Sequence, residues 1–157
     1  MKHMTEQKAE SLNCYLICIA MHIHNINYGG CGIFAELLFR ILVLKGYRCK
    51  LVCLDAFALR TPQDHKINLT WIRAREDNSI FLYNHICVLV GQYYFDCTNY
   101  ERKAKSGVFQ NAYDKVGELS VRQLQYLNSL DHKWNSTYDR RQNRALKILL
   151  THALTGF

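Results

Sequence analysis

The stretch NYGGCGIFAELLFRIL, at residues 27–42, constrains the fold more than any other part of the chain. Its apolar residues recur at the i, i+3, i+4, i+7, i+8 spacing of one helix face: Phe34, Leu37, Leu38, Ile41 and Leu42. Lys45 and Gly46 indicate the end of this helix, because a cation favours the last turn and a glycine favours the position beyond it. The spacing therefore predicts a helix from about Cys31 to Lys45 with one buried face.

The rest of the pattern predicts strands in the middle of the chain and helices at both ends. Strands are expected at 47–54, 79–90 and 93–97, with a further candidate at 67–72. Helices are expected in the N-terminal part, where Ser11 is a candidate cap and Leu12, Leu16, Ile19 and Ile23 form the stripe, and at 120–129 and about 139–154. This order predicts an α+β fold rather than a repeating βαβ unit.

At 157 residues the chain fits one domain, with a core at about 25–100 and a C-terminal helical part at about 117–155. Half of the residues are hydrophobic, and a packed core is expected. The N-terminal residues do not resemble a secretory signal, and no apolar stretch approaches the roughly 20 residues of a membrane span. With seven cysteines, an odd number, we expect reduced thiols and a cytoplasmic protein.

Cys31 lies at the predicted start of the helix. Unpaired N–H groups and the positive end of the helix dipole meet there, and both stabilise a thiolate. Gly29 and Gly30 allow a sharp turn and a close approach by a substrate carbonyl. The same N–H groups could hold the oxyanion of an acyl-transfer intermediate. The position therefore suits a nucleophile, although a buried structural cysteine is the alternative.

A base and its orienting group are predicted in the hairpin at 79–97. If Gly91-Gln92 is a two-residue loop, Val90 pairs with Tyr93 and Cys87 with Asp96. Side chains alternate between faces, so His85 and Asp96 share one face as diagonal neighbours. A carboxylate bonded to one ring nitrogen leaves the other free to take the thiol proton. Each residue alone has a structural explanation, but the three together favour catalysis.

At this point the residues resemble the transglutaminase-like superfamily of cysteine enzymes, within the papain-like fold group. The matching pieces are Gly29-Gly30-Cys31-Gly32 with the helix after it, His85-Ile-Cys-Val-Leu-Val90, and Asp96-Cys97-Thr98-Asn99. The resemblance covers about residues 25–100. It implies a core in which the cysteine helix packs on an antiparallel sheet, and the C-terminal third is outside it.

The resemblance implies Cys31 as nucleophile, His85 as general base and acid, and Asp96 as the residue that orients His85. Many members of the superfamily have a proline where this chain has Cys97. In papain-like relatives a side chain a few residues before the cysteine completes the oxyanion hole, and three residues are candidates here by their distance along the chain: Asn25, Asn27 and Tyr28.

The sequence therefore predicts a cysteine hydrolase or acyltransferase that acts on a peptide or side-chain amide, through a thioester and without a cofactor or metal. We expect a protein or peptide substrate rather than nucleic acid or a membrane, and the oligomeric state stays open. The alternative is a non-catalytic papain-like binding module that contacts a protein or nucleic acid through its basic C-terminal helices, in a chain of net charge +7. Cys14, Cys18 and His22 are spaced four apart, and here we favour a core stripe over a zinc site.

Overall fold

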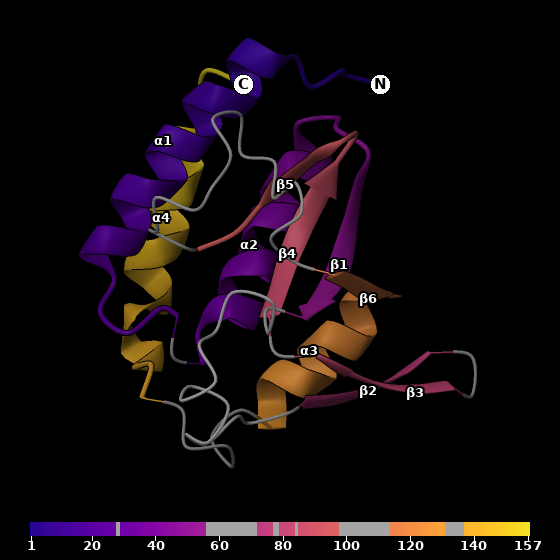
Figure 1. Cartoon of the computed structure of the whole chain (residues 1–157). Coiled ribbons are helices and arrows are strands. Elements are labelled where there is room, and N and C mark those ends of the chain that lie inside the picture. The colour runs from indigo at the N-terminus through magenta and orange to yellow at the C-terminus, as the bar shows by residue number, and fades with distance from the viewer. Residues whose placement is uncertain (28, 56–71, 77–78, 84, 98–113, 131–136) are drawn as a thin grey trace.

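The computed structural model describes residues 1–27, 29–55, 72–76, 79–83, 85–97, 114–130 and 137–157, and these form an α+β fold, as predicted (Figure 1). The helices are α1 (Glu6–His22), α2 (Cys31–Leu44), α3 (Val121–Leu130), a short 3₁₀ helix η4 (Arg140–Gln142) and α4 (Asn143–Ala153). The strands are β1 (Cys49–Asp55), β2 (Ile72–Glu76), β3 (Ser79–Tyr83), β4 (His85–Val90), β5 (Tyr93–Phe95) and β6 (Asp114–Leu119).

Four strands form an antiparallel sheet in the order β5-β4-β1-β6 (Figure 1). The pairing of β1 with β4 runs from Cys49 opposite Val90 to Leu54 opposite His85. On its other side β1 pairs with β6, and the register shifts between Cys53 and Leu54. Strands β2 and β3 pair with each other in a separate two-stranded sheet.

The β4–β5 hairpin has the predicted register where its strands meet. Val90 pairs with Tyr93, and Gly91 takes a φ of 63°, a left-handed conformation that favours glycine. The ladder ends with Val88 opposite Phe95, one pair short of the predicted pair that contains Asp96. The predicted alternation holds, because one face carries a small buried cluster made of Val52, Leu54, Cys87, Leu89 and Tyr94.

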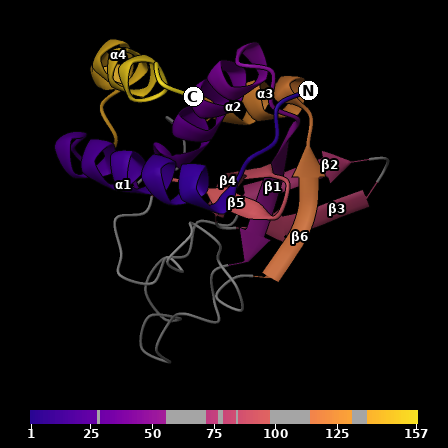
Figure 2. The same ribbon diagram turned by 90° about the horizontal axis from the view of Figure 1, so that it is seen from above.

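Helix α2 covers the other face of the sheet and lies at the centre of the fold. It contacts β4 and β1 on one side and α3 and α4 on the others (Figures 1 and 2). Phe34, Leu38 and Leu42 have no exposed surface, so the predicted face is the buried one. The helix begins at Cys31, as expected, and Gly46 with a φ of 89° follows its end. α1 packs against α4 and contacts β5.

The starts of α1 and α3 are fixed by side-chain caps. α1 begins at Glu6, and the hydroxyl of Thr5 accepts a hydrogen bond from the Lys8 amide, so the expected cap at Ser11 is wrong. At α3 the Ser120 hydroxyl accepts from the Gln123 amide, and the Gln123 side chain accepts from the Ser120 amide. This reciprocal pair is a capping box.

Two further boundaries differ from the prediction. The run 79–90 was expected as one strand, but β3 and β4 belong to different sheets. The C-terminal part from 117 was expected to be helical, but residues 114–119 form β6 beside β1. Residues 67–71 of the candidate strand at 67–72 lie outside the described residues. No helix in the described part of the chain combines the length and the apolar character needed to cross a membrane.

The residue before α2 is packed so closely that a side chain does not fit. A methyl group at Gly30 would lie 2.7 Å from the carbonyl oxygen of Ile26 and 2.9 Å from Cδ2 of the buried Tyr138. Because one of these atoms is backbone, we expect Gly30→Ala to lower the free energy of unfolding by about 1–3 kcal/mol. Urea unfolding monitored by circular dichroism measures this change.

Gly156→Ala is the matched control, because a methyl group there meets no heavy atom within 4 Å. Its unfolding free energy should stay within about 0.5 kcal/mol of the wild-type value. Equal urea midpoints for the two variants would contradict the close packing of Gly30.

Candidate active site

Cys31 is the first residue of α2 and is partly exposed, with its side chain packed against the edge of the hydrophobic core. The chain reaches it through a tight loop in which Asn25 has a φ of 56° and Gly29 a φ of 103°. The helix starts from Gly30, which provides no capping side chain. The first-turn N–H groups of α2 are therefore not covered by a side-chain cap.

His85 and Asp96 form a close pair at the ends of two neighbouring strands. His85 is the first residue of β4, and Asp96 follows β5 directly. Nε2 of His85 lies 2.6 Å from Oδ2 of Asp96, and the Asp96 side chain has no exposed surface. A buried carboxylate needs such a partner, because its desolvation is costly. The structure thus brings together the two residues that the predicted hairpin register paired.

Cys31 is close enough to His85 to raise the pKa of its ring, which joins the three predicted residues into one cluster. Burial by itself lowers the pKa of His85, but hydrogen bonds and negative charge from Asp96 and Cys31 outweigh burial and raise this pKa to about 10. Nε2 is the ring nitrogen that contacts Asp96. The site therefore favours an imidazolium between two acidic groups at neutral pH.

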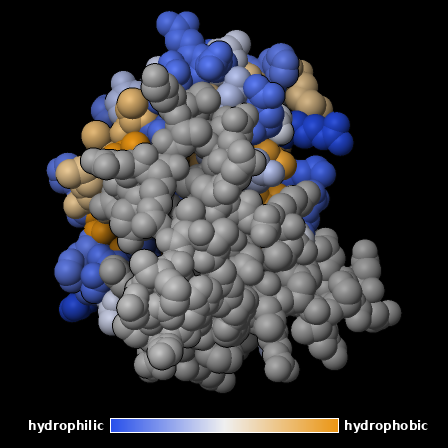
Figure 3. Space-filling view, in the orientation of Figure 1, coloured by the Kyte–Doolittle hydropathy of each residue, from blue (hydrophilic) through white to orange (hydrophobic). Residues whose placement is uncertain are grey.

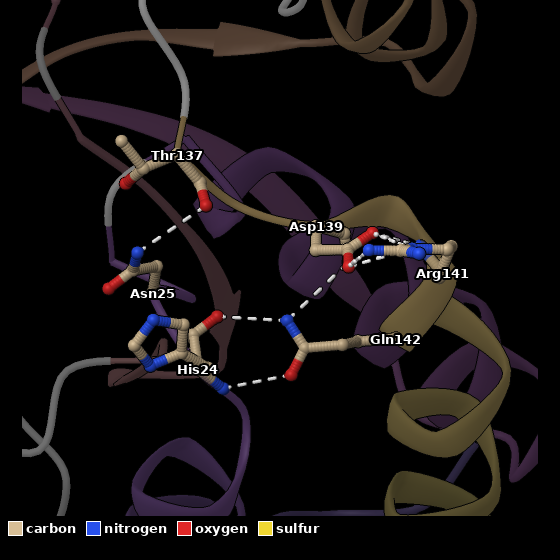
Figure 4. Close-up of polar contacts among 6 residues, drawn as sticks. All are labelled: His24, Asn25, Thr137, Asp139, Arg141 and Gln142. Carbon is tan, nitrogen blue, oxygen red and sulfur yellow. Dashed lines mark hydrogen bonds and ion pairs between the residues drawn. The ribbon is translucent and has the colours of Figure 1, made fainter.

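The three oxyanion-hole candidates have different surroundings. The side-chain nitrogen of Asn25 donates to the carbonyl oxygen of Thr137, 3.4 Å away, so this amide is held by the C-terminal part of the chain (Figure 4). Asn27 accepts a hydrogen bond from the Cys97 thiol through Oδ1 at 3.0 Å, next to Asp96. Tyr28 lies outside the described residues. Asn27 is thus the candidate bound to the end of the hairpin that carries Asp96.

Two residues that the sequence analysis did not assign to the site support its loop. Cys97 is fully buried, and its contact with Asn27 ties the strand end at Asp96 to the loop before Cys31. Tyr138 is buried against Gly30, and its hydroxyl donates to Oδ1 of Asn143 at 2.9 Å. No motif marks Tyr138. For Cys97 the signal in the sequence was that it stands where many members of the superfamily have proline.

Cys14 and Cys18 are exposed on α1, so the expectation that they form a core stripe is wrong. Nδ1 of His22 contacts the backbone oxygen of Cys18 at 2.7 Å. Among the residues that the structure describes, no three His, Cys, Asp or Glu side chains are arranged to hold a metal ion. Tyr15 and Met21 are also exposed on α1. On the face seen in Figure 3, the described part of the surface mixes hydrophilic and apolar patches.

If Asp96 raises the pKa of His85, removing the charge of Asp96 should lower that pKa. Asp96→Asn removes one negative charge while burial still disfavours the imidazolium, so the pKa of His85 should fall well below the wild-type value near 10. Nuclear magnetic resonance titration of the His85 ring measures the shift. An unchanged His85 pKa would contradict the pairing.

The same shift predicts how stability depends on pH. The folded-state pKa of His85 is raised from 6.5, so its contribution is complete below about pH 6.5 and is lost as the pH rises to about 10. The unfolding free energy of the wild type should therefore fall over this range relative to His85→Gln. Parallel curves for the two proteins would exclude a raised pKa.

Comparison of the chain with protein-family models, with curated proteins and with solved structures finds no match. The likeness to transglutaminase-like enzymes therefore rests on the residues named above. Function has to be argued from the geometry of Cys31, His85 and Asp96 rather than from a fold.

Proposed function

We propose that this protein is a cysteine-nucleophile enzyme that cleaves or exchanges an amide bond in a peptide or a protein side chain. One observation carries the proposal: a buried Asp96 contacts His85 at 2.6 Å, and Cys31 at the start of α2 is close enough to His85 to raise its pKa. A nucleophile, a base and a group that orients the base are the three parts that covalent acyl transfer requires.

The first half-reaction forms a thioester. The Cys31 thiolate attacks the carbonyl carbon, a sulfur–carbon bond forms, and the carbonyl electrons move onto oxygen. The carbon–nitrogen bond then breaks, and the leaving amine takes its proton from the His85 imidazolium. The buried Asp96 carboxylate accepts the hydrogen bond from Nε2 of His85 throughout the reaction. The proton that moves to the leaving amine is therefore the one on Nδ1.

The second half-reaction regenerates the free enzyme. Neutral His85 takes a proton from water, and the resulting hydroxide adds to the thioester carbon. The carbon–sulfur bond breaks, which releases the carboxylic acid and returns the thiolate beside an imidazolium. An amine in place of water would give acyl transfer. Hydrolysis is the simpler assignment, because it needs no second substrate site.

Two sets of donors can hold the oxyanion. The first-turn N–H groups of α2 carry no side-chain cap, and a helix N-terminus favours negative charge. The second is the side-chain nitrogen of Asn27, whose Oδ1 is fixed by Cys97. A core in which the cysteine helix packs on an antiparallel sheet supports the papain-like, transglutaminase-like assignment.

Selective chemistry at Cys31 tests the proposal. Limiting iodoacetamide at pH 7, read by mass spectrometry at each cysteine, should modify Cys31 ahead of the exposed Cys14 and Cys18. His85→Gln should slow modification of Cys31 by about 100-fold, in the range that general-base assistance supplies. Cys31→Ala should remove the fast phase and keep the circular dichroism spectrum of the folded protein.

A Cys14→Ser/Cys18→Ser variant is the matched control, because it removes two exposed thiols on α1 and should leave the Cys31 rate unchanged. Wild-type protein in which Cys31 reacts no faster than Cys14 would overturn the catalytic assignment. The binding-module alternative would then stand, and it predicts partner binding that weakens steeply with salt if phosphates are contacted.

A further inference from the structure

The segment from Thr137 to Gln142 lies against the loop that leads to Cys31. The carboxamide of Gln142 meets both polar groups of one backbone position: the His24 amide donates to Oε1 at 2.9 Å, and Nε2 donates to the His24 carbonyl oxygen at 3.0 Å (Figure 4). We call these two bonds the Gln142 clasp. They join positions 118 residues apart in the sequence.

The clasp is one of several contacts from the same segment to the surroundings of Cys31. Tyr138 packs on Gly30, the residue directly before the cysteine. Arg140 donates to the backbone oxygen of Asn128, and Oδ1 of Asn128 occupies the space where a side chain at Gly32 would lie. Residues 137–142 therefore contact the chain before Cys31 directly and the chain after it through Asn128.

The loop needs support from outside, because its conformation is irregular. Asn25 and Gly29 have positive φ values, and inside the loop the amide of Ile26 donates to Ile23 at 3.4 Å and that of Gly30 to Ile26 at 3.0 Å. Nucleophilic attack is sensitive to errors of about 1 Å in the position of the reacting atom. Contacts from other elements help a loop of this irregular conformation to meet that tolerance.

We infer that Gln142 is a positioning residue for the nucleophile, acting through the backbone of His24. This role rests on the proposed function of Cys31. This role requires a primary carboxamide, because that group offers a donor and an acceptor side by side, one for each backbone polar group of His24. The C-terminal segment thus belongs to the working site, although it contributes none of the reacting groups.

The experiment compares Gln142→Ala with wild type in two measurements. The rate of iodoacetamide modification of Cys31 at pH 7 should fall at least about tenfold, since the nucleophile loses its fixed position. Hydrogen–deuterium exchange at the His24 amide should become faster, because this group loses its acceptor. Gln142→Glu keeps the acceptor and loses the donor, so both values should lie between those of wild type and Gln142→Ala.

Two control variants separate positioning from general destabilisation. Arg141→Ala changes the neighbouring exposed residue, which pairs with Asp139, and should leave both measurements at wild-type values. Leu150→Val loosens the buried face of α4 away from the clasp, and should lower the thermal midpoint without slowing Cys31. An equal loss of Cys31 reactivity in Leu150→Val would overturn the positioning role.

The remaining outcomes also decide between the hypotheses. A wild-type rate for Cys31 in Gln142→Ala, or unchanged exchange at His24, would overturn the inference while leaving the catalytic assignment standing. If wild-type Cys31 shows no selective reactivity, the proposed function fails and the positioning role fails with it. Exchange at His24 would still report in that case whether the clasp forms.

Discussion

The contact between Asp96 and His85 is the constraint on which the site depends. The Asp96 side chain has no exposed surface, and a buried carboxylate without a partner is strongly destabilising. His85 supplies the partner, so the folded chain needs the ends of β4 and β5 in one register. A slip of one residue would turn the two side chains to opposite faces. The same contact holds the His85 ring through Nε2. The folded state and the proposed catalysis thus both require the same register of the β4–β5 hairpin.

The parts of the fold that could be predicted are those fixed by local interactions. The start of α2 at Cys31 and its end before Gly46 follow from short-range signals, and so does the pairing of Val90 with Tyr93 around Gly91. Hairpin parity then placed His85 beside Asp96 without knowledge of any distant contact. The proximity of Cys31 to that pair is different. It depends on how α2 packs across the sheet, and only the pattern of the three residues together indicated it.

The wrong predictions concern segments whose structure depends on packing against residues distant in the sequence. Residues 114–119 include Gly117 and Glu118 and have little strand character of their own, but β1 offers them an edge to pair with. An apolar run such as 79–90 does not record that β3 and β4 join different sheets. The exposure of Cys14, however, could have been predicted from the sequence. It lies two residues after the buried Leu12, and two steps of a helix turn a side chain by about 200°, away from the core.

The start of α2 lacks a stabilising feature that α1, α3 and η4 have, although α4 also begins without a side-chain cap. Thr5 caps α1, Ser120 caps α3 and Asp139 caps η4, whereas Gly30 offers α2 no side-chain cap. A good cap contributes about 1 kcal/mol, but it would also occupy the N–H groups beside Cys31. Packing of Gly30 on Tyr138 and the Gln142 clasp hold the chain there instead. An uncapped helix start remains ordered because residues beyond the 25–100 core support it, so the geometry proposed for the nucleophile depends on the C-terminal segment as well as on the hairpin.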